Sequence, residues 1–198
     1  MADSFGVKLG AKAARLLARL GRTDILPGLT ERELTGIETR FGFAFAEEHR
    51  AFLSVGLPTG PGWPDWRHGS AVQLRSWLDK PVEGVLFAVA EAAFWHPAWG
   101  TRPAGRTDAV SGARAHLASV PQLVPVHSHR YLPAVRGAIA HPVLSVRGPD
   151  IIPYGYDLID YVRREFGGPQ DSTEEGQRAV AVTTAFWADF LTWSNWEG

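Results

Sequence analysis

The chain has 198 residues, of which 45% are hydrophobic and 21% are charged. This balance is typical of a globular domain with a core of its own and excludes a disordered or fibrous chain. The formal net charge of −1 gives no overall field that would attract nucleic acid or an anionic membrane, and the absence of cysteine excludes disulfides and thiolate metal sites. No apolar run is long enough to span a bilayer, so we expect a soluble, cytoplasmic protein.

The N-terminal part of the chain reads as three helices. The first covers Phe5–Leu20, with leucines on one side and basic residues on the other. The second begins at a capping box formed by Thr30 and Glu33 and ends at Gly42. The third covers residues 46–55. We expect residues 1–28 to form an N-terminal helical extension and residues 29–198 a single domain.

Proline and glycine break up the centre of the chain. Residues 57–63 read as a loop, and a helix over 71–78 is expected to end ahead of Pro81, because a residue before proline avoids helical geometry. The apolar run 85–90 is rich in valine and phenylalanine and predicts a buried strand. A further helix is expected over 107–119.

Short strands and two helices are expected in the C-terminal part. The strands are residues 123–126, 143–146 and 151–152, an amphipathic helix covers 157–166, and an aromatic helix covers 186–196. Helices therefore come first, strands cluster in the middle, and helices follow. This order predicts an α+β fold with helices packed on one side of a small, mainly antiparallel sheet.

Two loops rich in tryptophan are the most distinctive feature of the chain. The first tryptophan loop covers residues 62–67 and the second covers residues 94–100. Tryptophan and arginine are enriched in interface hot spots, but loop tryptophans also fill gaps in a core. We expect most of the rings to be packed and three polar members, Asp65, Arg67 and His96, to be exposed. The candidate partner-binding residues are Trp63, Asp65, Trp66, Arg67, Trp95, His96 and Trp99.

Candidates for chemistry are few. His127 and His129 are two residues apart and would share one face of a strand, where they could bind a metal ion together. No third ligand follows at a recognisable spacing, so we predict no metal site and expect a hydrogen-bonded or exposed pair at a strand end. Glu91 and Asp150 are expected to cap loop backbone at strand ends rather than to act as acids. The sequence has no nucleophile turn and no phosphate-binding glycine pattern, so we predict no catalytic residue and no cofactor.

A set of segments, in order along residues 29–166, resembles a known family. The segments are 29–38, 41–42, 48–53, 56, 84–87, 94–95, 99–100, 121–126, 129–133, 142–146, 150–152 and 154–158. They resemble the SUKH superfamily, which takes in Smi/Knr cell-wall regulators and bacterial immunity proteins, and in particular its stand-alone actinobacterial members. One departure is Ala44-Phe45-Ala46, where the family often has Leu-Pro before its second helix. A proline there only pre-sets the first helical turn, so the expected fold does not depend on it.

The resemblance implies an α+β domain that binds a partner protein and is not an enzyme. In the immunity branch the partner is a toxin, usually a nuclease or a deaminase, and no catalytic residues carry over. The residues themselves leave an alternative: a small-molecule-binding protein or enzyme with a pocket between the tryptophan loops that uses Glu91, His96, His127 and His129. A purely structural role for the loops is the third possibility.

Overall fold

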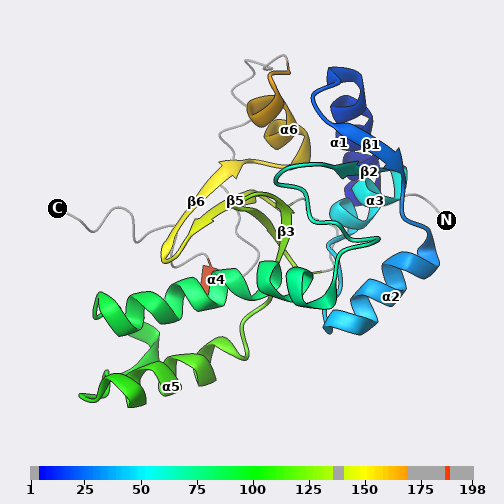
Figure 1. Ribbon diagram of the computed structural model, residues 1–198. Coiled ribbons are helices and arrows are strands. Elements are labelled where there is room, and N and C mark those ends of the chain that lie inside the picture. Colours follow the sequence, from blue (N-terminus) through cyan, green and yellow to red (C-terminus); the bar gives the residue numbers. More distant parts are fainter. Residues whose placement is uncertain (1–4, 136–140, 169–185, 188–198) are drawn as a thin grey trace.

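Six helices and two antiparallel sheets make up the part of the chain that the computed structural model describes, residues 5–135, 141–168 and 186–187 (Figure 1). The predicted α+β class is confirmed. The predicted aromatic helix over 186–196 lies outside the described residues except for Phe186 and Trp187.

The three N-terminal helices form where the sequence predicts them. They are α1 (Phe5–Leu20), α2 (Glu31–Phe41) and α3 (Glu47–Val55). Both arms of the capping box that begins α2 are present, because the Glu33 backbone N–H donates to the Thr30 hydroxyl and the Thr30 backbone N–H donates to the Glu33 carboxylate. Gly42 ends α2 in the left-handed conformation, with φ of 76°.

A two-stranded sheet includes part of the segment 57–63, which the sequence predicts to be a loop. In it β1 (Asp24–Pro27) pairs with β2 (Gly56–Thr59), with Ile25 opposite Pro58. Proline has no N–H to donate to a neighbouring strand. It is tolerated here because both strands of a two-stranded sheet are edge strands, each paired on one side only. The pairing joins β1, which precedes the domain boundary predicted at residue 28, to a strand that follows it, and α1 packs against α3 and α6 (Leu158–Phe166).

The predicted helix end at Pro81 and the predicted strand over 85–90 are wrong, because a single helix, α4 (Ala71–Glu91), runs through both. Proline has no backbone N–H, so Pro81 leaves the carbonyl of Trp77 without its helical donor. The hydroxyl of Tyr131 donates to this carbonyl instead, at 3.2 Å. The apolar run 85–90 is the buried face of the helix, which a short window does not distinguish from a buried strand.

Tyr131→Phe is therefore expected to lower the free energy of unfolding by about 1–2 kcal/mol, because it leaves the Trp77 carbonyl unpaired. Burial raises the pKa of Tyr131, so its hydroxyl keeps the proton that it donates. Urea denaturation measures the effect, with the exposed Tyr156→Phe as a control that should change little. Pro81→Ala restores a backbone N–H to α4, so Tyr131→Phe should cost less in that background. An equal cost in both backgrounds would contradict this role of Tyr131.

The main sheet is an antiparallel meander in chain order. Its strands are β3 (Leu123–His127), β4 (Arg130–Pro133), β5 (Val143–Arg147) and β6 (Asp150–Gly155). Residues from one face, which include Val124, Val126, Leu132 and Val143, join a first core with α1, α2, α3, α6 and the N-terminal part of α4. Residues from the other face, which include Leu123, Tyr131, Leu144 and Val146, join a second core with α4 and α5 (Arg106–Leu117).

Helices thus cover both faces of the sheet and not one face as predicted. Figure 1 shows α4 and α5 together on one side of the strands and α6 with α1 and α3 on the other. The physical reason is that β3, β4 and β5 are apolar at successive positions, so both faces of the sheet must be removed from water. Among the helices of the described residues, none combines the length and the apolar character needed to cross a membrane.

Candidate functional site

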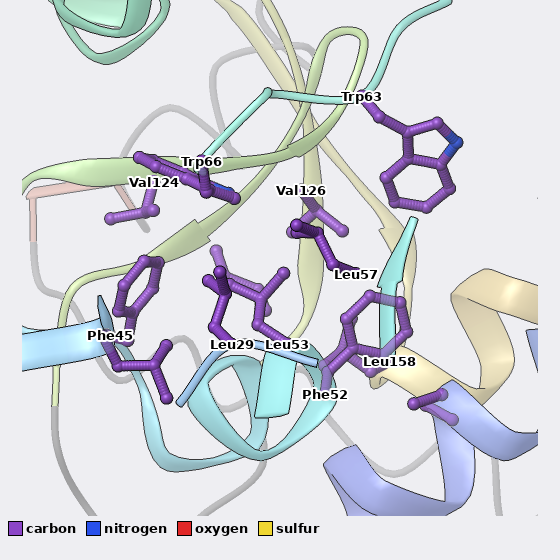
Figure 2. Close-up of a cluster of buried hydrophobic side chains, with 14 of the residues drawn as sticks. Leu29, Phe45, Phe52, Leu53, Leu57, Trp63, Trp66, Val124, Val126 and Leu158 are labelled. Atoms are coloured by element: carbon purple, nitrogen blue, oxygen red, sulfur yellow. The ribbon is translucent and has the colours of Figure 1, made fainter. Parts of the chain in front are cut away.

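The first tryptophan loop fills the first core with its rings. Trp63 is 8% exposed and Trp66 is 4% exposed. Trp66 meets Phe45 edge-on with ring centroids 5.4 Å apart, and Trp63 stacks on Phe52 at 6.4 Å (Figure 2). These two rings are therefore packed, as expected for loop tryptophans that fill gaps in a core.

The polar members of this loop differ from each other. Asp65 is exposed, and its carboxylate accepts a hydrogen bond from the backbone N–H of His68 at 2.9 Å. Arg67 is half-buried rather than exposed. Its guanidinium donates to Glu33 at 2.6 Å and to the carbonyls of Pro27 and Gly28, each at 3.0 Å. The Arg67 guanidinium and the hydrogen bonds from Thr30 lower the pKa of Glu33 to about 2. Arg67 thus anchors the loop to the start of α2.

The second tryptophan loop packs in the second core. Trp99 is 9% exposed, and the half-buried Trp95 donates its indole N–H to the carbonyl of Gly100 at 2.8 Å. His96 is only 4% exposed, so its predicted exposure is wrong. Its Nδ1 accepts from the backbone N–H of Ala98 at 3.2 Å and so caps a 3₁₀ turn, Pro97–Trp99.

The two tryptophan loops lie at opposite ends of α4, which at 21 residues is about 30 Å long. The groups that a pocket between the loops would need are therefore divided. His127 packs on Trp63 with ring centroids 4.5 Å apart, whereas His96 packs on Trp99 at 5.6 Å. Glu91 ends a helix rather than a strand and forms an ion pair with Arg106.

The expected pairing of His127 and His129 on one strand face is also wrong. Ser128 has a left-handed φ of 51° and lies in the turn between β3 and β4, so the alternation of strand side chains stops there. In the part of the chain that the structure describes, no group of three or more His, Asp or Glu side chains could hold a metal ion.

The structure instead forms a pocket that the sequence did not predict, here called the α4–turn pocket. It is an open pocket of about 420 Å³ between the middle of α4 and the turns β3–β4 and β5–β6. Lys80 and Trp77 line it from α4, Ser128 and His129 from one turn, and Arg147, at the end of β5, and Gly148 from the other side.

Two glycines bring the walls of this pocket together. A Cβ atom on Gly84 would lie 2.7 Å from the Cα of Gly148, so α4 and the β5–β6 turn touch through their backbones. Gly148 also has a φ of 64°, which L side chains rarely adopt. Arg147, the residue before it, is thereby held beside α4.

A chain of hydrogen bonds links the two turns. Arg147 lies 3.3 Å from His129 Nε2, and the hydroxyl of Ser128 lies 3.2 Å from His129 Nδ1. Arginine can only donate, so Nε2 accepts and the ring proton is on Nδ1, which donates to the Ser128 oxygen. Burial and the nearby Arg130 and Arg147 cations lower the pKa of His129, which keeps the ring neutral at pH 7. The hydroxyl hydrogen of Ser128 then remains available to an acceptor in the pocket.

A second polar cluster is closed to solvent. Glu48 is 0% exposed, and one of its carboxylate oxygens accepts from the His141 backbone N–H at 2.8 Å and from His141 Nδ1 at 2.7 Å. The hydrogen bonds from His141 outweigh burial, so that the pKa of Glu48 is lowered and the carboxylate stays ionised. Because this pair is sealed inside the molecule, we interpret it as a structural tie between α3 and the start of β5.

The neighbouring His49 predicts sensitivity to acid. Burial lowers the pKa of its imidazole from 6.5 to about 4. The folded state favours the neutral ring, so this contribution to stability is complete above pH 6.5 and is lost as the pH falls toward 4. We expect the free energy of unfolding to fall by about 1 kcal/mol per pH unit in this window. Urea denaturation across pH measures the slope, which should be shallower in His49→Gln. An equal slope in that variant would contradict the role of His49.

The chain was compared with protein-family models, curated proteins and solved structures. No family model, no curated protein and no solved structure matches the chain. The fold and the site define a class only: an α+β domain whose antiparallel sheet is covered by helices on both faces, with an open pocket where one helix meets two hairpin turns.

Proposed function

We propose that this chain is a non-catalytic protein-binding module of the SUKH type, a regulatory or immunity protein that acts in the cytoplasm by occluding a partner protein. The resemblance of residues 29–166 to that superfamily supports the proposal, and the α+β fold agrees with it. A net charge of −1 favours a protein as the partner over nucleic acid or a membrane surface.

The observation that carries the proposal is an exposed row on α4, here called the α4 face. Its residues are spaced by four, four, three and four positions, so they lie along one side of the helix. All are exposed, and the two large apolar members, Val72 and Phe87, are 80% and 69% exposed. The α4 face consists of Val72, Ser76, Lys80, Glu83 and Phe87.

The surroundings of the α4 face favour an interface. Trp77 is half-buried next to the face and lines the α4–turn pocket with Lys80, so apolar surface, an aromatic ring and cations lie together. Tryptophan and arginine are enriched in interface hot spots, and Trp77 and Arg147 both line the pocket. The helix beneath is firmly held, because its opposite side is buried in both cores. A partner would therefore meet a preformed surface.

Site-directed photo-cross-linking in the cells that produce the protein tests this proposal. A benzophenone amino acid replaces Ser76 or Phe87 on the α4 face, or the equally exposed Thr39 on α2 as the matched control. We expect an adduct of the same mass from positions 76 and 87, containing one partner protein, and none from position 39. Equal adducts from all three positions, or none from α4 while the protein is folded, would contradict the proposal.

A further inference from the structure

We propose that the α4–turn pocket binds a carboxylate side chain of the partner, an aspartate or glutamate that stands beside an apolar residue. This inference rests on the proposed function and names the chemical group that the partner places next to the α4 face. Lys80, on the α4 face, also lines the pocket, so one bound segment can contact both.

The charges in the pocket favour an anion. Lys80 stands on the helix wall and Arg147 on the turn wall, and each is exposed to solvent. The acidic residue among those lining the pocket, Glu83, is neutralised in part by Arg114, whose guanidinium lies 3.0 Å from it. Arg147 donates one N–H group to His129. The other N–H donors of the planar Arg147 guanidinium are left for a carboxylate.

The walls of the pocket favour an anion attached to an apolar body. Pro81 and Val146 are buried lining residues and supply apolar surface. The indole of Trp77 adds an aromatic wall, and the ammonium of Lys80 lies 5.9 Å from the centre of its ring. Such a wall contacts a neighbouring aliphatic or aromatic side chain better than it contacts a free ion.

The same geometry favours a carboxylate over a phosphate group. A phosphate brings nearly two negative charges at pH 7, and Glu83 lines the pocket as a fixed negative charge. A carboxylate brings only one charge, so Glu83 repels it less, while its two oxygens can still accept two parallel hydrogen bonds from the arginine fork. The Ser128 hydroxyl, whose oxygen accepts from His129, can donate its hydrogen to one of these oxygens.

Titration of the ¹⁵N-labelled full chain followed by NMR tests the inference. The probe is the acetylated and amidated peptide GFEG, its neutral counterpart is GFQG, and inorganic phosphate is the third ligand. We expect GFEG to shift the backbone amides of Ser128, His129, Arg147 and Gly148 in a saturable way, and GFQG to bind about tenfold more weakly because it lacks the charge. Equal binding of the two peptides, or tighter binding of phosphate than of GFEG, would overturn the assignment of a carboxylate.

Two variants locate the effect. Arg147→Gln is expected to weaken GFEG about tenfold, whereas Arg106→Gln, which removes an exposed arginine at the start of α5, should leave the affinity unchanged. The amide spectrum of each variant shows whether it is folded. Equal affinity in both variants would overturn the pocket as the site. Cross-linking at Phe87 reports on the proposed function separately: adducts that persist while the peptide fails to bind would leave the interface standing and remove the carboxylate site.

Discussion

Glu48→Ala should destabilise the chain by about 3–5 kcal/mol, the largest effect that we expect from a single truncation. The substitution leaves two buried donors, the backbone N–H and the ring Nδ1 of His141, without their acceptor. The two residues are 93 positions apart, so their contact ties α3 to the start of β5 in the main sheet. Its loss weakens the junction between the helical layer and the sheet.

Glu31→Ala is the matched control for this experiment. Glu31 is the first residue of α2, and Glu48 is the second residue of α3. The side chain of Glu31 is 79% exposed in an ion pair with Arg50. An exposed pair of this kind contributes about 1 kcal/mol or less. Both substitutions remove one negative charge. Urea denaturation should nevertheless show a much larger fall in the free energy of unfolding for Glu48→Ala than for Glu31→Ala. Similar losses would show that the burial of Glu48 contributes nothing beyond a surface ion pair.

Gly10→Ala should destabilise the chain by about 3 kcal/mol or more through overpacking, although alanine favours a helix over glycine by about 1 kcal/mol. A Cβ atom at this position would lie 2.0 Å from the carbonyl oxygen of Glu48. That atom belongs to the backbone of α3 and cannot rotate away, so α1 would have to move off α3. The close approach of these two helices therefore requires a glycine in the middle of α1.

Gly36→Ala reverses the sign of the effect. Gly36 is exposed on α2, and a Cβ atom there would have no atom within 4 Å. The substitution should stabilise the chain by about 0.5–1 kcal/mol through helix propensity alone. Thermal or urea unfolding of the two variants should thus shift in opposite directions. A stabilised Gly10→Ala variant would contradict the close packing of α1 on α3.

The elements that the sequence predicts well are those with complete local signals. The capping box at Thr30 and Glu33, the left-handed Gly42 and the capping carboxylate of Asp157 all act within four residues of the helix end that they define. Local signals failed where a distant residue decides the outcome. Pro81 remains inside a helix because Tyr131, 50 residues further on, supplies the missing donor.

The α4–turn pocket was out of reach of sequence reasoning for the same reason. Its cations Lys80 and Arg147 line the same pocket because the backbones of Gly84 and Gly148 are in contact. The residues near either glycine in the sequence do not predict this contact. Ser128 gives no local sign that it adopts a left-handed conformation and ends the strand between the two histidines. One usable signal was present: the spacing of Val72, Lys80 and Phe87 fits one side of a helix longer than the one predicted.

Most of the rings of the two tryptophan loops are packed inside the molecule. Trp63 and Trp66 belong to the first core and Trp99 to the second, and the buried side of α4 contributes to both cores. The opposite side of α4 carries the exposed row of residues and the pocket beside it. If a partner binds the α4 face as proposed, the loops contribute by packing in the cores that hold this helix.

Hydrogen–deuterium exchange of the full chain, alone and bound to the partner recovered by cross-linking, tests the proposed interface most directly. Binding at the α4 face predicts slower exchange in α4 and in the turns at residues 128–129 and 148–149, with unchanged exchange in α2. Protection confined to α2 or to the two tryptophan loops, with α4 and these turns unchanged, would contradict it.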